Sequence, residues 1–211
     1  MKKKITIVDY GLGNIISAQQ SFLNVSDRFG WDSEVLITDK PKDIKSSSHI
    51  VLPGQGAFKS CMEGLTGIDG MVEQLSECVI TKKIPFLGIC VGMQLLADES
   101  YENGKHSGLG WIKGKIKKLP SSNIKLPHMG WNVVETNINP SKLEISKQKN
   151  DFYFVHSYYF DCFDEKYILG TTDYGINFAS IICKENIYGV QFHPEKSSEQ
   201  GLSLIKDFLL L

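Results

Sequence analysis

The sequence predicts an α/β protein: a mostly parallel central sheet flanked by helices, with an added antiparallel portion toward the C-terminus. The N-terminal half alternates short apolar runs with segments of helical spacing, which is typical of a parallel sheet covered on both faces. After about Lys113 this alternation gives way to closely spaced strand-like runs. The 211 residues, 42% of them hydrophobic, suit a single domain over 1–211 with a sizeable core.

The expected elements follow from hydrophobic periodicity and from turn residues. In the first half, strands are expected over 4–9, 35–38, 49–52 and 84–89, and helices over 14–22, 71–81 and 93–99. Asn14 is expected to cap the first helix, and a turn is expected around 24–30. In the second half, strands are expected over 131–136, 152–160, 167–172, 179–183 and 187–192, and a final helix over 199–210.

Composition excludes several classes of function. The 23 basic and 24 acidic side chains give a net charge of −1, so no field attracts nucleic acid. The longest apolar stretch, 84–97, is shorter than the roughly 20 residues that cross a bilayer. No signal peptide fits the N-terminus. A soluble protein that binds neither nucleic acid nor membrane is therefore expected.

Cysteine and arginine usage narrows the chemistry further. The five cysteines are an odd number without a Cys-x-x-Cys pair, so neither a disulfide framework nor a metal site is expected. A reducing cytoplasm is the expected location. Arg28 is the only arginine, so bidentate clamping of an anionic group is nearly unavailable. Backbone N–H groups, hydroxyls or lysine would have to hold any such group.

Residues 85–94, Pro-Phe-Leu-Gly-Ile-Cys-Val-Gly-Met-Gln, indicate a nucleophile. An apolar strand runs into Gly-x-Cys-x-Gly and a helix follows, which is the nucleophile-elbow pattern with cysteine in the serine position. The turn strains its middle residue and needs small neighbours, hence Gly88 and Gly92. Cys90 would then lie at a helix N-terminus, which favours the thiolate. The alternative is a structural cysteine in a glycine-rich turn.

His193-Pro194-Glu195, after the last predicted strand, indicates a base and the group that orients it. Residues two apart in extended chain point the same way. Glu195 is therefore expected to hold one ring nitrogen of His193 while the other faces a thiol. A solvated surface pair is the alternative. The histidines at 49, 106, 128 and 156 lack a carboxylate two residues on, and His156 is expected to be packed or to line the substrate.

Two glycine-rich turns remain. In 53–56, Pro-Gly-Gln-Gly, backbone N–H groups could stabilise an oxyanion together with the N–H of Val91, although an ordinary turn explains the segment alone. Gly11-Leu-Gly13 lacks the third glycine of a dinucleotide-binding fingerprint. No cofactor is therefore expected.

Together these motifs resemble those of the class I glutamine amidotransferases, whose Cys, His and Glu follow in the same order. Three stretches are similar to one branch, the amidotransferase subunits of imidazole glycerol phosphate synthase: 9–14 (Asp-Tyr-Gly-Leu-Gly-Asn), 127–132 (Pro-His-Met-Gly-Trp-Asn) and 153–157 (Tyr-Phe-Val-His-Ser). His-Pro-Glu-Lys-Ser at 193–197 is also typical of this branch. The resemblance covers about 4–205 and implies a flavodoxin-like fold.

The resemblance implies hydrolysis of L-glutamine to glutamate and ammonia. Cys90 would form a γ-glutamyl thioester, His193 would carry the proton and Glu195 would orient His193. The N–H groups of Gln55 and Val91 would form the oxyanion hole, with Gln55 replacing the family's usual small apolar residue. The pocket for glutamine would be lined by Gly54, Gly56, Gln94, His156, Ser157 and Tyr158.

The resemblance also implies a partner. Ammonia would pass to a separate (β/α)8 cyclase subunit, which makes imidazole glycerol phosphate and an aminoimidazole carboxamide ribotide in histidine biosynthesis. Trp131, Tyr153 and Lys196 would lie near the interface of this heterodimer, although core packing accounts for either aromatic as well. Three alternatives stay open: a stand-alone thiol hydrolase, a non-catalytic relative, and an amidotransferase with another ammonia acceptor.

Overall fold

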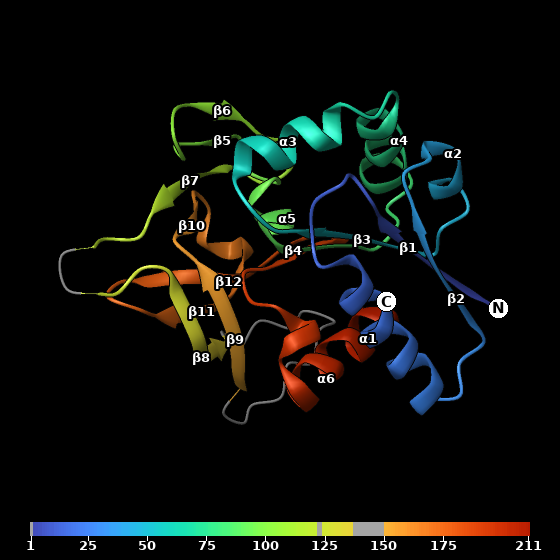
Figure 1. The fold of residues 1–211 in the computed structure, drawn as a ribbon. Coiled ribbons are helices and arrows are strands. Elements are labelled where there is room, and N and C mark those ends of the chain that lie inside the picture. The colour runs from blue at the N-terminus through green and yellow to red at the C-terminus, as the bar shows by residue number, and fades with distance from the viewer. Residues whose placement is uncertain (1, 122–123, 137–149) are drawn as a thin grey trace.

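The computed structural model describes residues 2–121, 124–136 and 150–211, and one sheet runs through them (Figure 1). The first strands are β1 (Lys3–Val8), β2 (Ser33–Thr38), β3 (His49–Gly54), β4 (Phe86–Cys90), β5 (Glu99–Ser100), β6 (His106–Ser107) and β7 (Gly114–Lys118). The later ones are β8 (His128–Thr136), β9 (Asn150–His156), β10 (Tyr158–Cys162), β11 (Ile168–Asp173), β12 (Asn177–Lys184) and β13 (Ile187–Val190).

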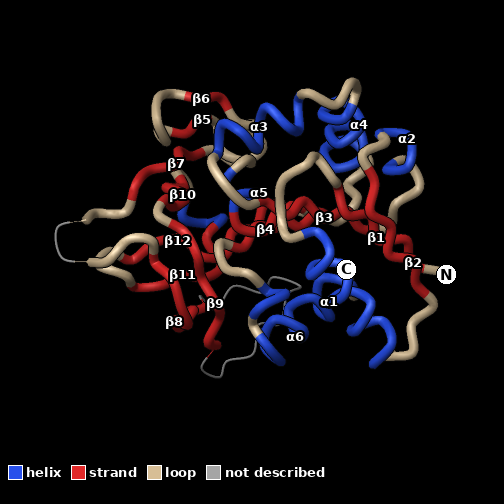
Figure 2. The backbone as a smooth tube through the Cα atoms, viewed as in Figure 1, coloured by secondary structure: helices blue, strands red, loops and turns tan. Residues whose placement is uncertain are grey.

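Helices cover both faces of this sheet (Figure 2). They are α1 (Ile15–Arg28), α2 (Pro41–Ile44), α3 (Phe58–Thr66), α4 (Met71–Ser76), α5 (Val91–Gln94) and α6 (Ser198–Leu209), with single turns η1 (Glu77–Thr81), η2 (Glu165–Tyr167) and η3 (Pro194–Lys196). Helices α1 and α6 pack together on one face, and α3 and α4 lie on the other. None of the helices described is long and apolar enough to cross a membrane.

The predicted fold class is confirmed. Strands β2-β1-β3-β4-β13 pair in parallel and form the centre, where Ile5, Val51 and Leu87 are fully buried. Strand β13 then pairs antiparallel with β12, which begins the predicted antiparallel portion. That portion continues through β10 and β7 on one path and through β11, β8 and β9 on another.

Two local expectations about helices are wrong, and one helix was missed. Helix α1 runs through the predicted turn to Arg28, because Val25 continues the buried stripe that Phe22 begins. The helix expected over 93–99 ends at Gln94, since the next three carbonyls accept hydrogen bonds from N–H groups within 109–112 instead. Helix α3 was not expected at all.

The strand expected over 152–160 is two strands that meet at Ser157. Strand β9 pairs with β8, whereas β10 pairs with β7. The Ser157 carbonyl accepts from the Leu119 N–H at the point where the partner changes. This break turns the segment around Ser157 toward the carboxyl ends of the parallel strands.

Candidate active site

The carboxyl ends of three central strands bring the distant motifs together. Gly54 at the end of β3 pairs in register with Cys90 at the end of β4, and β13 lies on the other side of β4. Open α/β sheets bind ligands at this edge of the strands. Gln55 follows Gly54 and Val91 follows Cys90, so Gln55 and Val91 lie beside one another at this edge.

Cys90 occupies a strained turn, as the elbow pattern predicts. Its φ of 54° and ψ of −110° lie outside the regions that ordinary residues prefer. A Cβ on Gly88 would come within 2.6 Å of the Gly92 carbonyl oxygen, and one on Gly92 would overlap the Leu52 carbonyl. The helix that follows has only four residues. Its dipole is therefore a weaker source of thiolate stabilisation than the sequence suggested.

His193 and Glu195 are in direct contact. The imidazole Nδ1 lies 2.9 Å from the carboxylate Oε1, and the two side chains are only 4% and 3% exposed. The contact is the predicted one, but its backbone is different: β13 ends at Val190, and Glu195 lies within the 3₁₀ turn η3. The Asn14 side chain, expected to cap α1, makes no capping bond and instead lies 3.4 Å from Glu195 Oε1.

Charge couples this pair to the thiol. Burial lowers the pKa of His193, but hydrogen-bonding contacts and charge from Cys90, and then from Glu195, raise it to a net value of about 10. A protonated imidazole beside the sulfur stabilises a thiolate. The Cys90 Sγ also lies 3.8 Å from the Val155 carbonyl oxygen and accepts from Gln191 Nε2 at 3.7 Å.

Gln55 and Val91, whose backbone N–H groups are expected to form an oxyanion hole, both line the cavity that contains Cys90. Val91 is the first residue of α5, and the first N–H groups of a helix have no intrahelical acceptor. Gln55 follows β3, its side chain is exposed, and its carbonyl accepts from Cys61 Sγ at 3.6 Å. The Tyr10 hydroxyl donates to the neighbouring Pro53 carbonyl at 2.7 Å. These contacts hold the turn beside the elbow.

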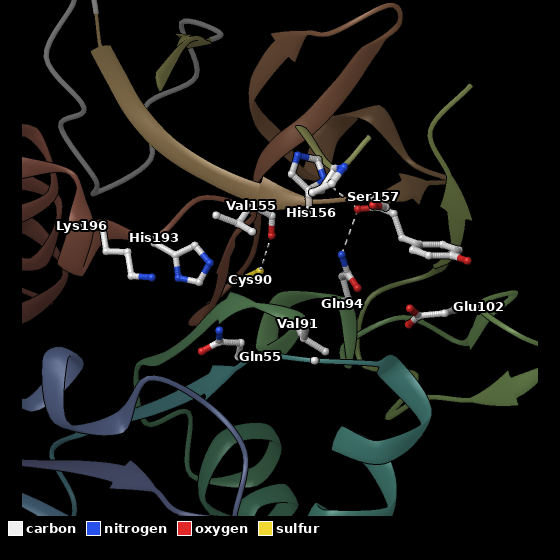
Figure 3. A pocket seen from close by; sticks show the side chains of 13 residues that line it. Gln55, Cys90, Val91, Gln94, Glu102, Val155, His156, Ser157, His193 and Lys196 are labelled. Atoms are coloured by element: carbon white, nitrogen blue, oxygen red, sulfur yellow. Dashed lines mark hydrogen bonds between the residues drawn. The ribbon is translucent and has the colours of Figure 1, made fainter. Parts of the chain in front are cut away.

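A cavity of about 380 Å³ opens over Cys90 (Figure 3). Most of the predicted site residues line it: Gln55, Gly56, Cys90, Val91, Gln94, His156, Ser157, Tyr158, His193 and Lys196. Gly54 does not, because it packs behind the turn against α5, where a Cβ would strike the Gly92 backbone. Glu195 stands behind His193. Within the described ranges no three His, Cys, Asp or Glu side chains gather as a metal site.

Glu102, Pro127 and Val155 also line the cavity, although the motifs did not single them out as site residues. Pro127 and Val155 lie inside quoted motif stretches. Glu102 belongs to a loop without periodicity, so no local signal marks it. Its Oε2 accepts from the Phe58 N–H at 2.6 Å. In Figure 3 Glu102 and Lys196 lie at opposite ends of the cavity lining, so the cavity has a carboxylate at one end and an ammonium group at the other.

The remaining two expected residues lie outside the cavity. Trp131 on β8 is 53% exposed, and its ring packs edge-on against Tyr153 with centroids 6.1 Å apart. Met129 and Val133 alternate with Trp131 along β8 and are exposed too. The Tyr153 carbonyl accepts from the His193 N–H at 2.9 Å, which joins this face to the segment that carries His193 and Glu195.

Acid should destabilise the fold through buried histidines. Burial lowers the pKa of His49 and of His128 to about 4 and that of His156 to about 3. Because an unfolded histidine titrates near 6.5, the unfolded chain binds more protons below that pH, and the free energy of unfolding decreases as pH falls toward 4. The raised pKa of His193 acts oppositely: its stabilisation is present below pH 6.5 and is lost as pH rises toward 10.

Denaturant unfolding between pH 4 and 9 should therefore give maximal stability near pH 6.5. On the acid side each of these histidines contributes a slope of up to about 1.4 kcal/mol per pH unit. His49→Gln removes one titrating group far from Cys90 and should make the slope shallower. A free energy of unfolding that stays constant between pH 6.5 and 4.5 would contradict the assignment.

Comparison with known proteins decides the family. The family model for glutamine amidotransferase class-I matches residues 6–211. The chain is a class I glutamine amidotransferase. This amidotransferase is 48% identical to the imidazole glycerol phosphate synthase subunit HisH of Pelagibacter ubique, over 98% of this chain and 99% of the relative. It is 43% identical to the subunit of the same name from Rhodospirillum rubrum, over 98% of both chains.

Solved structures agree on the fold of this amidotransferase. A structure described as a glutamine amidotransferase superposes with a TM-score of 0.71 at 16% identity and covers 97% of both chains. A glutamine amidotransferase from Thermotoga maritima gives a TM-score of 0.63 at 20% identity, over 99% of this chain and 84% of that one. The overall fold of this amidotransferase is therefore one that solved amidotransferase structures share.

Proposed function

We propose that this amidotransferase is the glutaminase subunit of an imidazole glycerol phosphate synthase. It hydrolyses L-glutamine and passes the ammonia to a cyclase subunit of histidine biosynthesis. The observation that carries the chemistry is the meeting of Cys90 and His193 at one cavity, with Glu195 hydrogen-bonded to His193. The choice of acceptor is supported by relatives named HisH, 48% and 43% identical over nearly the whole chain.

The proposed mechanism gives each of these residues one role. The Cys90 thiolate adds to the side-chain amide carbon, and the N–H groups of Gln55 and Val91 stabilise the oxyanion. The protonated His193 then gives its proton to the leaving nitrogen, so the C–N bond breaks and ammonia departs from a γ-glutamyl thioester. His193, again neutral, takes a proton from water as the water attacks the thioester. Glu195 orients the ring and stabilises its charged form throughout.

The cavity fits an amino acid that carries its charge at one end. Glutamine binding through its amide at Cys90 places the α-ammonium group toward a wall of the cavity. Glu102 supplies a carboxylate in that wall, and the chain has only one arginine, which is not there. We assign Glu102 as the acceptor for the α-ammonium group. Gly56, Gln94, Ser157 and Tyr158 complete the proposed pocket.

Glu102→Gln should raise the KM for glutamine by about 10- to 100-fold, the worth of one hydrogen bond to a charged group. The kcat should change less than about threefold, since the amide still accepts from the Phe58 N–H and the reacting groups are untouched. Steady-state glutamate release measures both constants. Glu99→Gln, which alters ion pairs with Lys105 and Lys115 nearby, is the matched control and should leave KM unchanged. An unaltered KM in Glu102→Gln would refute the assignment.

The partner's docking face is proposed on β8 and β9. Met129, Trp131 and Val133 expose an apolar row on one face of β8, with Tyr153 beside it, and Lys196 lies in the adjoining cavity. Aromatic side chains are frequent anchors of protein interfaces. Tyr153, which packs beside this row, accepts a backbone hydrogen bond from His193, so the row adjoins the segment that carries His193 and Glu195.

Glutamine turnover by the isolated chain should be weak, and it should rise when the cyclase subunit and its nucleotide ligand are added. In the proposed function the cyclase subunit holds the ammonia acceptor, so hydrolysis without that subunit would waste glutamine. Glutamate release with and without the partner measures the effect. Strong turnover that is independent of the partner would favour a stand-alone thiol hydrolase instead.

Two further assignments accompany this role. We infer that residues 1–211 form a single domain, which is supported by one sheet that joins both halves of the described chain. We also place the enzyme in the cytoplasm. None of the five cysteines is paired in a disulfide, as is usual in a reducing compartment.

A further inference from the structure

Two buried imidazoles lie in direct contact beside the cavity, and the triad does not use them. His128 and His156 face each other across the β8–β9 pair, 3% and 6% exposed. Nδ1 of His128 is 3.0 Å from Nε2 of His156. The His128 ring is stacked between Tyr174 and Phe154, with centroids 3.9 and 4.7 Å away.

The hydrogen bonds of this pair can run in only one direction. Burial lowers the pKa of both rings well below 6.5, so at neutral pH each ring has one N–H and one acceptor nitrogen. Nδ1 of His156 lies 2.8 Å from the Tyr158 carbonyl oxygen, which can only accept. Nε2 of His156 must therefore accept, and Nδ1 of His128 must donate to it.

The same reasoning extends this series of hydrogen bonds from His128 to Asn132. Nε2 of His128 is left as an acceptor, and the Asn132 amide nitrogen lies 3.2 Å from it. The second amide hydrogen of Asn132 goes to the Asp173 carbonyl at 3.0 Å, and its oxygen accepts from the Val133 N–H at 2.8 Å. Both contacts require the same orientation of the amide. Every donor from Asn132 to Tyr158 is thus matched to an acceptor.

At the Tyr158 end, this series of hydrogen bonds continues to Cys90. The Tyr158 carbonyl that accepts from His156 also accepts from Gln94 Nε2 at 3.0 Å. Gln94 Nε2 donates in turn to Gln191 Oε1 at 3.0 Å, and Gln191 Nε2 lies 3.7 Å from Cys90 Sγ. Figure 3 shows the cavity side of this arrangement, with the bond from Gln94 drawn.

We propose that His128 and Asn132 are positioning residues for glutamine hydrolysis, which hold His156 and the Tyr158 carbonyl so that Gln94 is fixed in the wall of the pocket. The assignment rests on the proposed glutaminase function. His128 and Asn132 point inward from β8, whereas Met129, Trp131 and Val133 between and beyond them are exposed. A protein that docks on the exposed row therefore contacts the same strand, β8, that carries His128 and Asn132.

A matched pair of substitutions separates the hydrogen bond from the packing. His128→Asn and His128→Leu introduce side chains of nearly the same shape, and both remove the stacked ring. Only Asn keeps a donor at the position of Nδ1, facing His156. In the complex with the cyclase subunit, His128→Leu should raise the KM for glutamine about tenfold, as expected for a buried acceptor left without its donor. His128→Asn should stay within about threefold of wild type.

The rates at which two reagents alkylate Cys90 can be compared, and a general loss of stability would not change their ratio. A glutamine-like diazo-ketone, which must occupy the pocket, should react about tenfold more slowly with His128→Leu than with His128→Asn. Iodoacetamide, which needs no pocket, should react equally with both. Melting temperatures of both variants should fall, because both lose the stacking.

The outcomes separate the two levels of the proposal. If wild type hydrolyses glutamine and the Leu and Asn variants share one KM and one diazo-ketone rate, His128 acts only through packing and the positioning role is wrong. If both reagents slow equally in His128→Leu, the defect lies at the sulfur and not in the pocket, which also overturns it. A wild-type complex without glutaminase activity would defeat the proposed function itself.

Discussion

Cys90→Ser is expected to abolish glutamine hydrolysis, with kcat lower by a factor of about 10⁴ or more, as when a triad nucleophile is removed. The serine hydroxyl is a far weaker nucleophile than the thiol that it replaces, since it holds its proton much more tightly. The complex should still use free ammonia, because that reaction belongs to the partner. Glutamate release and ammonia-dependent product formation measure the two activities separately.

The matched control for this variant is Cys162→Ser. Cys162 is half-buried on β10, and its thiol lies 3.4 Å from the Asp164 carbonyl, away from the cavity. Its replacement should leave kcat within about twofold of wild type, because Cys162 does not line the cavity. A diazo-ketone should label wild type and the control at Cys90 only. Labelling at a different cysteine, or turnover in Cys90→Ser, would contradict the assignment.

Local sequence was sufficient where the chemistry depends on backbone constraints. Gly88 and Gly92 flank Cys90 because a Cβ at either position would meet backbone atoms, so the elbow is visible as a pattern of glycines. The contact between His193 and Glu195 is also local, since only Pro194 separates them. The extended backbone expected for that contact is wrong, because the chain already turns at η3.

Where function depends on distant strands, the sequence carried no comparable signal. Glu102 enters the cavity because β5 and β6 hold its loop there, and nothing in its neighbours marks it. The pairing of His128 with His156 depends on the register between β8 and β9, and the two residues are 28 positions apart in the sequence. The helix expected over 93–99 was wrong for the same reason, since the carbonyls of 95–97 accept hydrogen bonds from N–H groups within 109–112.

Glu195→Gln should lower kcat by about 10³- to 10⁴-fold, the range found when the orienting carboxylate of a triad is neutralised. The amide is nearly the same shape and can still accept from His193 Nδ1, but it removes one of the two charges that raise the pKa of His193. In addition, Glu195 Oε2 is buried without a hydrogen-bond partner among the described residues, so an amide nitrogen placed there would be a buried donor left unsatisfied.

The pH profile distinguishes this electrostatic role from a loss of packing. With the pKa of His193 about 10 in wild type, the imidazolium that assists departure of ammonia persists well above neutral pH and is lost only as pH rises toward that value. In Glu195→Gln the alkaline limb of kcat/KM should therefore move to lower pH. Glu199→Gln, which breaks only the exposed pair with Arg28, should leave the limb in place. If the limb of Glu195→Gln coincides with that of wild type, the carboxylate does not stabilise the charged imidazole, and proton transfer by His193 needs another partner.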